Sequence, residues 1–258
     1  MSDIVSNINR DFVTRLAYEG KRIDGRKFDE FRSISIENGL ITSAEGSARV
    51  KLGKTDVIAG IKITAGEPFP DTPNSGILTT NAELLPMASP SFESGPPSPE
   101  SIELARVVDR GIRESNMIDT KALCITPGQK VYVIFVDIHV IDYDGNLFDA
   151  ASMAAVSALS NTVVPASNYD AGEDFKLPVV EVPVSVTAVK IGDNIMVDPC
   201  LDEESIADAR LTVTTDSKGS VRAMQKGLAG SFTQEEVENI INTSLLLGQK
   251  NRKVIEGD

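Results

Sequence analysis

The feature that most constrains the fold is an almost continuous apolar run over residues 130–142, which reads KVYVIFVDIHVID. A strand with few polar interruptions is typical of the interior of a sheet. The run therefore predicts a strand, Lys130–Asp142, that is covered on both faces. His139 is the single histidine and lies inside this run. Without a partner in an evident motif, we expect it to be a packed strand residue rather than a catalytic base.

A helix is predicted to begin directly after a proline-rich loop. Pro96, Pro97 and Pro99 exclude a helix before residue 98, because proline lacks an N–H and pushes the preceding residue out of the helical region. Ser98 is the expected N-cap, with Pro99 at the first helical position. Apolar residues then cover a broad arc, so the helix over residues 99–115 should be mostly buried.

Three arginines share the remaining strip of this helix. At about 100° per residue, Arg106, Arg110 and Arg113 fall within roughly a 60° sector, which suits a nucleic-acid phosphate backbone. The alternative is structural. Glu103 stands three residues before Arg106, and Glu114 four after Arg110, which is the spacing of ordinary helix-surface ion pairs. The spacing alone favours these ion pairs.

The net charge limits how this chain can bind nucleic acid. It is −13, from 25 Lys and Arg against 38 Asp and Glu, which argues against non-specific attraction to nucleic acid. Any RNA contact must therefore be local, or shared with a more basic partner. Aromatic residues make up 5% of the chain, with no Trp, so base stacking on aromatic platforms is not expected.

Cysteine and histidine are too few for a metal or disulfide framework. Cys124 and Cys200 form no CxxC motif, so we expect no metal, no cofactor and a reducing, intracellular environment. No apolar run approaches the roughly 18 residues of a membrane span. The N-terminus carries Asp3 and Asp11 in place of the basic region of a signal peptide. The expectation is a cytoplasmic protein without a membrane segment.

The first half of the chain is predicted to be rich in antiparallel strands. Apolar residues at helical spacing over 4–16 predict an N-terminal helix that ends before Gly20. In the polar loop that follows, Arg22, Asp24 and Arg26 are expected to cap or cross-link strands rather than to catalyse. Short alternating runs separated by glycine turns then indicate a meander. The predicted strands are residues 33–37, 40–44, 47–52, 55–64 and 77–85.

The second half repeats the order of strands followed by a helix. A helix rich in Ala and Ser is predicted over 147–161, and the aperiodic stretch after it is typical of a linker. Strands over 182–190 and 194–197 and a hairpin over 211–225 precede a helix opened by a capping box at Thr233 and Glu236. This pattern indicates an α+β fold. We expect one domain over 1–165, a linker over 166–178 and a second domain over 179–258.

Four segments, in order, resemble the RNase PH family of phosphorolytic exoribonucleases. They are RIDGR at 22–26, GSARVKLGKTDVIAGI at 46–61, SIELARVVDRGIRES at 101–115 and DGNLFDAASMAAVSAL at 144–159. The resemblance covers nearly the whole chain and is strongest to the non-catalytic RNase PH-type subunits of the archaeal exosome core. It implies a large domain of the ribosomal-protein-S5 domain 2 type and a smaller C-terminal α+β domain.

Two departures from the family's active pattern imply that this chain is not an enzyme alone. Active members carry an Arg-Arg pair before the Ile-Glu-Leu of the helix, where this chain has Pro99 and Glu100. Active members also carry Gly-Gly-Thr-Arg in the turn that binds inorganic phosphate, where this chain has Gly145-Asn146-Leu147-Phe148. The family's catalytic aspartate falls on Glu204, or with gaps on Asp202 or Asp208.

The resemblance therefore implies a structural, RNA-gripping subunit of a hexameric ring that degrades RNA from the 3′ end. Three copies alternate with three copies of a catalytic subunit, as a trimer of heterodimers, together with RNA-binding cap proteins. Arg106 and Arg110 match the arginines that face single-stranded RNA, and Arg113 is a weaker candidate. The alternatives are a self-sufficient phosphorolytic exoribonuclease that uses Glu204, and an assembly protein without RNA contact.

Overall fold

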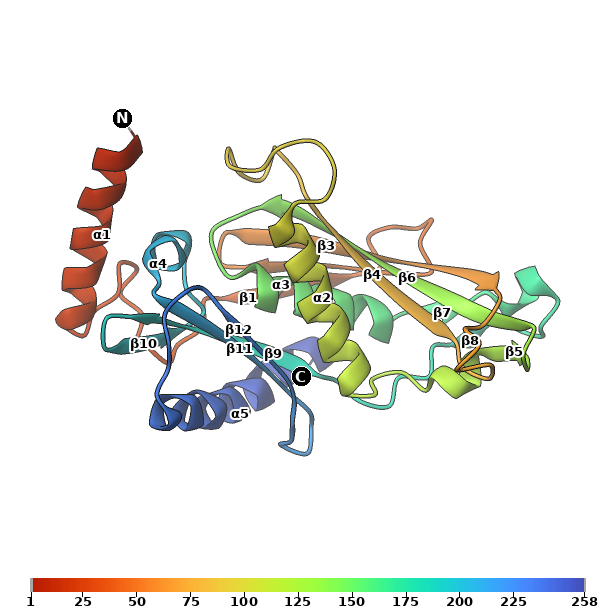
Figure 1. The fold of residues 1–258 in the computed structure, drawn as a ribbon. Helices are drawn as coiled ribbons and strands as arrows, with labels where there is room; N and C mark the ends of the chain where they lie inside the picture. Colours follow the sequence, from red (N-terminus) through yellow and green to blue (C-terminus); the bar gives the residue numbers. More distant parts are fainter. Residues whose placement is uncertain (1, 258) are drawn as a thin grey trace.

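One helix, α3 (Leu147–Ser160), packs against both of the larger β-sheets (Figure 1). The computed structural model describes residues 2–257. Every residue from Leu147 to Leu159 is buried, as expected of a helix that is covered on all sides. The small Ala and Ser side chains permit this close approach. α3 is thus the element that joins the two halves of the chain.

The first sheet contains six strands, β1 (Ile34–Asn38), β2 (Gly46–Leu52), β3 (Thr55–Gly66), β4 (Ile77–Leu84), β5 (Cys124–Thr126) and β6 (Lys130–Asp142). Their order is β1-β2-β3-β6-β4, with β5 paired to β6. All neighbours are antiparallel except β4 and β6, which are parallel. The meander is confirmed for its first, third and fourth predicted strands, which correspond to β1, β2 and β3.

The strand predicted over residues 40–44 is wrong. β1 pairs directly with β2, so that Asn38 stands opposite Ala48 and the residues between them form the loop of a hairpin. Gly39 adopts a φ of 74°, and its N–H donates to the Ser47 carbonyl oxygen at 2.8 Å, which closes that loop. Leu40 is exposed. The apolar residues of this segment resembled a strand in sequence, but the segment has no neighbouring strand to pair with.

The expectation that β6 is covered on both faces is also wrong. Alternate residues from Tyr132 to Val140 are buried, beneath α3 and α2 (Pro99–Glu114), whereas Phe135 and its neighbours on the other face are only half-buried. His139 lies on this outer face with 41% of its side chain exposed, and its Nδ1 is 3.3 Å from Glu83 Oε2 on β4. It is a cross-strand contact on the surface and not a packed residue.

The second sheet contains four strands, β9 (Val184–Ile191), β10 (Asn194–Val197), β11 (Ala209–Thr215) and β12 (Val221–Gly227). Their order is β10-β9-β11-β12, and all are antiparallel. The predicted hairpin is confirmed, and its turn is closed by a hydrogen bond from the Gly219 N–H to the Asp216 carbonyl oxygen at 3.2 Å.

Helices cover both faces of the second sheet. On one face lies α5 (Gln234–Glu256), which begins at the predicted capping box of Thr233 and Glu236. Ile240 of α5 packs in a buried cluster with residues of β9 and β11. On the opposite face lies α2, where a Cβ built on Gly111 would be 3.4 Å from Thr214 Cγ2. α2 is therefore held between the first sheet and the second.

The N-terminal helix is confirmed as α1 (Ser2–Tyr18). The side chains of Ile4, Val5 and Ile8, which open its predicted apolar face, lie outside the described residues. Val13 and Ala17 pack against side chains of β9 and β10, and not against the first sheet. The short helix α4 (Leu201–Ile206) follows β10 and lies beside α1 (Figure 1).

The segment expected to link the two domains is packed against the first one. It contains the 3₁₀ helix η2 (Ala166–Tyr169) and β8 (Phe175–Lys176), which pairs with β7 (Val163–Val164). A second 3₁₀ helix, η1 (Thr120–Leu123), precedes β5. Ala166 and Leu177 are buried in the same cluster as α3. The boundaries at residues 165 and 179 stay a prediction.

Candidate nucleic-acid interface

α2 begins where its sequence predicts. Ser98 Oγ accepts a hydrogen bond from the Ser101 N–H at 3.2 Å, and Pro99 occupies the first helical position. The predicted apolar arc is buried apart from Ile102, which is 48% exposed. This fixed start sets the rotation of the helix, and it leaves Arg106 and Arg110 exposed at its surface.

Arg106 and Arg110 form no salt bridge within residues 2–257. The acid that spacing assigned to Arg106 is engaged elsewhere, since Glu103 Oε1 lies 2.6 Å from Nη2 of Arg210 on β11. Arg110 Nη1 donates to the amide oxygen of Gln225 on β12 at 3.2 Å, which leaves its charge uncompensated. The ion pairs expected from spacing are therefore absent at these two positions in the described part of the chain.

Arg113 differs from its two neighbours. Its Nη2 lies 2.9 Å from Asp109 Oδ1, and its Nε donates to Asp109 Oδ2 at 3.2 Å, which makes a two-point ion pair. Nη2 also donates to the Leu78 carbonyl oxygen at 3.2 Å. This arginine ties α2 to β4, so its charge and geometry are both committed to the fold.

A hollow of about 450 Å³ lies between α2 and β12. Arg106 and Arg110 lie on its wall, together with Ile102, Val107 and the Gln225 side chain. The two arginines, with Glu103 between them and Pro99, thus border an open space. Guanidinium groups without an acid partner are strong donors to phosphate oxygens.

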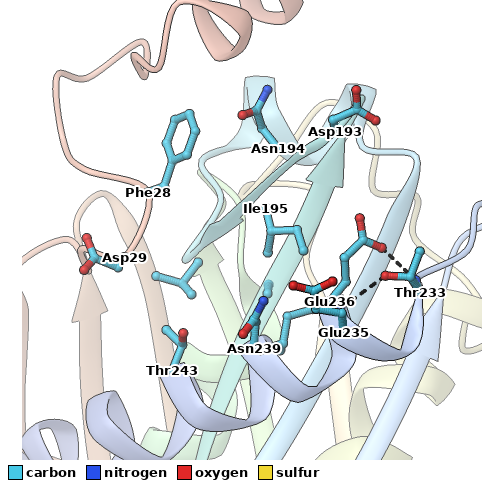
Figure 2. Close-up of a pocket in the computed structure, with 13 residues that line it drawn as sticks. Phe28, Asp29, Asp193, Asn194, Ile195, Thr233, Glu235, Glu236, Asn239 and Thr243 are labelled. Carbon is cyan, nitrogen blue, oxygen red and sulfur yellow. Dashed lines mark hydrogen bonds between the residues drawn. The ribbon is translucent and has the colours of Figure 1, made fainter.

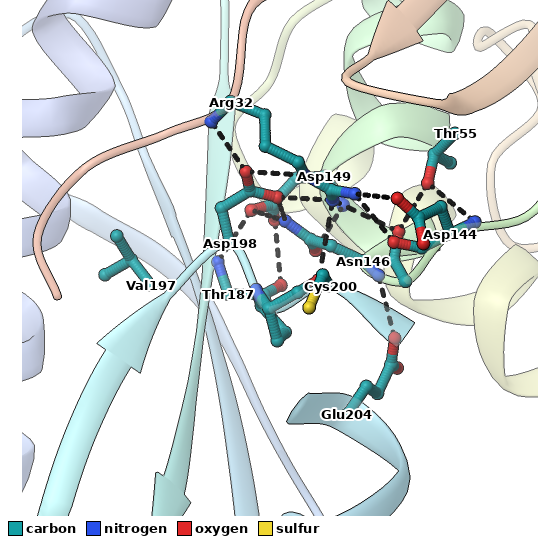
Figure 3. Close-up of polar contacts among 12 residues, drawn as sticks. Arg32, Thr55, Asp144, Asn146, Asp149, Thr187, Val197, Asp198, Cys200 and Glu204 are labelled. Atoms are coloured by element: carbon teal, nitrogen blue, oxygen red, sulfur yellow. Dashed lines mark hydrogen bonds and ion pairs between the residues drawn. The ribbon is translucent and has the colours of Figure 1, made fainter. Parts of the chain in front are cut away.

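The turn before α3 is occupied by an acid from the second half of the chain (Figure 3). Glu204 Oε2 accepts a hydrogen bond from the Asn146 N–H at 2.8 Å and from the Tyr143 hydroxyl at 3.4 Å. Of the three acids proposed for this place, Glu204 is the one that faces the turn, since Asp202 and Asp208 are exposed. Burial raises the pKa of Glu204, although its donors oppose that shift.

Phe148, in the first turn of α3, carries a cation on the face of its ring. The ring of Phe148 is buried, and the guanidinium of Arg210 stacks on it at 4.1 Å. Arg210 also lies 4.0 Å from Glu204 Oε1, so it stands between the acids of α2 and α4. Arg210 therefore connects the helix of the arginine strip to the turn.

Asn146, the N-cap of α3, lies between two buried carboxylates (Figure 3). Its side-chain amide donates to Asp149 Oδ2 and to Asp198 Oδ1, both at 2.8 Å. Burial raises the pKa of Asp149 to about 7, although Asn146 and Thr187 donate to it. Burial alone would also raise the pKa of Asp198, but two hydrogen bonds from Arg32 hold it below its ordinary value.

The loop before β1 has the cross-linking role expected of it. Arg22 forms a buried ion pair with Glu203, with Nε and Oε1 2.8 Å apart, and its Nη2 donates to the Asp198 carbonyl oxygen at 2.8 Å. Arg26 lies 2.6 Å from Asp24 and 3.0 Å from an Asp198 carboxylate oxygen. These contacts hold the loop against the second sheet. The three side chains are engaged in them and are therefore not available for catalysis.

Sequence reasoning did not single out Arg210, Asp149, Asp198 or Gln225. Each lies in an ordinary helix, strand or acidic stretch, and each has at least one partner from a distant part of the chain. The one local signal was Asp149, an aspartate within the apolar sequence of α3. A carboxylate buried there needs hydrogen-bond donors, which indicates a buried polar network. Within the described residues, no group of three or more acids, histidines or cysteines is placed to hold a metal ion.

The described residues also contain no helix that is both long and apolar enough to cross a bilayer.

Comparisons with known proteins agree on one family. Residues 30–165 match the model of domain 1 of the 3′ exoribonuclease family (RNase PH), and residues 181–245 match the model of its domain 2. The chain is 54% identical over 255 residues to the protein named exosome complex component Rrp42 of Methanocella arvoryzae, which covers 99% of this chain and 98% of that protein.

Solved structures show the same fold. One, described as an Archaeoglobus fulgidus exosome with RNA bound to the active site, contains a chain that matches with a TM-score of 0.95 and 50% identity, covering 97% of this chain and 99% of that one. A second, described as an archaeal exosome core, matches with a TM-score of 0.92 and 46% identity over 99% of both chains. The two-domain RNase PH-like α+β fold expected from the sequence is thereby confirmed.

Proposed function

This chain belongs to the RNase PH family of 3′ exoribonucleases, and from that premise we propose that it is a non-catalytic, RNA-gripping subunit of an exosome core. Three copies alternate with three copies of a catalytic RNase PH-type subunit in a hexameric ring, a trimer of heterodimers, which RNA-binding cap proteins complete. Relatives named as exosome components support this assignment, as does the likeness to a chain of an RNA-bound exosome.

The observation that carries the proposal is the side chain of Phe148 at the turn before α3. In active members, by the resemblance, this turn binds inorganic phosphate. Here the Asn146 N–H donates to Glu204, and Phe148 stands where those members have an arginine. A phosphate ion would therefore lack the cation that active members supply, and it would meet a backbone donor that is already used. Phosphorolysis by this chain alone is therefore disfavoured.

Arg106 and Arg110 supply the RNA contact in this proposal. Both are exposed, neither is neutralised by an acid of the described residues, and both border the hollow between α2 and β12. A local pair of free cations can bind RNA although the chain as a whole is acidic, because salt screens charges more than about 10 Å away. We place the assembly in the cytoplasm, where the free thiols of Cys124 and Cys200 stay reduced.

A phosphate-dependent assay distinguishes this proposal from a self-sufficient exoribonuclease. The pure chain is incubated with single-stranded RNA and inorganic phosphate, and release of nucleoside diphosphate is measured. We expect none from the chain alone, and more from the chain together with its catalytic partner than from the partner alone. Robust release by the pure chain that Glu204→Gln abolishes would establish the enzyme instead.

An assembly role without RNA contact makes a separate prediction. In that case the ring would keep its RNA affinity when Arg106 and Arg110 are both removed, and only ring formation would depend on this chain. The free guanidinium groups of both residues argue against it.

A further inference from the structure

A groove with an apolar floor lies on the α5 side of the second sheet (Figure 2). It encloses about 480 Å³, within the range of known ligand pockets. Its floor is formed by Val197 and Ile240, which are buried, with Ile195 and Phe28 half-buried beside them. α2 lies against the opposite face of this sheet, so the groove is separate from the arginines Arg106 and Arg110.

Three acids on the wall of this groove carry uncompensated charge. Asp29, Asp193 and Glu235 are exposed, and none of them forms a salt bridge or a side-chain hydrogen bond with another described residue. Glu236 differs, because it lies 2.6 Å from Lys190 Nζ and accepts a hydrogen bond from the Thr233 N–H at 2.7 Å. The groove therefore combines an apolar floor with three free negative charges around it.

We propose that this groove binds a basic segment of a partner protein, in which a lysine or arginine lies among aliphatic residues. The long stem of such a cation is apolar and its tip is charged, so it buries methylene groups while the tip stays near acids. Ile195 and Ile240 offer the surface for the stem and for an aliphatic neighbour. Asp29, Asp193 and Glu235 offer the charge for the tip.

Charge excludes the other occupants. RNA is repelled by the three carboxylates, and a second copy of this chain would bring the same three carboxylates to a two-fold contact at this groove. The N-terminal end of α5, which borders the groove, contributes only about half a positive charge. Its first turn already carries Glu235 and Glu236. An anionic ligand is therefore also disfavoured there.

Peptide binding to the full chain tests this inference. The probe is an acetylated and amidated octapeptide of alternating lysine and leucine. Two matched probes replace lysine by glutamate or leucine by serine. Amide chemical shifts of the labelled protein report where each probe binds, and we expect the first probe alone to saturate, with shifts centred on Ile195 and Asn239. The double variant Asp193→Asn/Glu235→Gln should weaken the affinity for the lysine–leucine probe by about tenfold or more.

A second double variant controls for net charge. Glu67→Gln/Glu114→Gln removes the same two charges at exposed positions outside the groove, and we expect it to change the affinity by less than about twofold. Equal weakening by both double variants, equal binding of the serine probe, or absence of saturable binding would each overturn the proposal. So would saturable binding of an RNA oligonucleotide with shifts at the same residues.

Discussion

Three arginines on one face of α2 end in three different surroundings. Arg113 is fixed by Asp109, Arg110 meets only the neutral amide of Gln225, and Arg106 has no polar partner among the described residues. Arg113 therefore has a structural use, whereas the charges of Arg106 and Arg110 are not compensated by an acid of the described residues. Because the surroundings differ, substitution of each arginine can test its contribution to stability separately from its contribution to RNA binding.

We predict that Arg106→Ala/Arg110→Ala weakens RNA binding by the assembled ring. Each lost phosphate contact should also reduce the slope of log K against log salt by about 0.7. The free energy of unfolding should change by less than about 0.5 kcal/mol, since no ion pair is lost. A salt titration of RNA affinity and a denaturant titration measure the two effects.

Arg113→Ala is the matched control. It should lower stability, through the lost contacts to Asp109 and Leu78, and leave the RNA affinity unchanged. An unchanged affinity of the double variant at every salt concentration would return Arg106 and Arg110 to ordinary helix surface.

Asp149 makes stability depend on pH. Its pKa is about 7 in the folded chain, against 3.8 for an ordinary aspartate. Between these values the folded state binds more protons than the unfolded state, so this group's contribution is lost as pH rises. The free energy of unfolding, relative to Asp149→Asn, should fall by up to about 4 kcal/mol between pH 4 and pH 7. Urea titrations of both proteins across that range test it, and parallel pH profiles would contradict it.

Asp198 acts in the opposite direction and does not disturb this comparison. Its pKa is held low, so its contribution is lost only as pH falls below the ordinary aspartate value. That loss lies at and below the lower end of the pH range over which the two proteins are compared.

At the scale of elements, the turn before α3 is pressed against the start of α4. A Cβ on Gly145 would lie 2.5 Å from the Cys200 carbonyl carbon and 2.6 Å from the Leu201 nitrogen, and Gly145 has a φ of 86°. We predict that Gly145→Ala lowers the free energy of unfolding by more than about 3 kcal/mol, because strain and collision with backbone add. Gly128→Ala is the control.

Gly128 has a φ of 72° and nothing within 4 Å of a built Cβ, so its substitution carries only the backbone strain, about 1–2 kcal/mol. Chemical denaturation of both variants measures the difference. Equal losses would show that the contact with α4 is not rigid.

Short-range sequence signals predicted most of the helices and strands of this fold. They did not predict which elements pair with one another across long sequence separations. Ser98 and Thr233 correctly predicted where α2 and α5 begin, because an N-cap is a hydrogen bond between residues close in sequence. Leu40 was wrongly assigned to a strand, since the register of β1 on β2 decides what lies in the loop. Glu103 was assigned to the wrong arginine, because its true partner, Arg210, lies 107 residues away.

At the scale of the whole molecule, two features invite assembly. β1 and β4 are edges of the first sheet, and the outer face of β6 exposes part of its apolar side chains. We predict that this chain and a catalytic RNase PH-type subunit, expressed together, elute as one closed hetero-oligomer in size exclusion with light scattering. Separate elution as monomers at micromolar concentration would contradict the ring.

The burial of α3 also has a consequence for the order in which the chain is made. α3 is complete at Ser160, but β9, which covers one of its sides, starts only at Val184. On the ribosome, the first sheet emerges with a helix that is still bare on one side. The N-terminal half therefore cannot reach its final packing before β9 has emerged. In a chain that stalls before residue 184, Asp149 and Ser152 of α3 lack their partners Thr187 and Ser185, which leaves the unfinished fold open to chaperones and proteases.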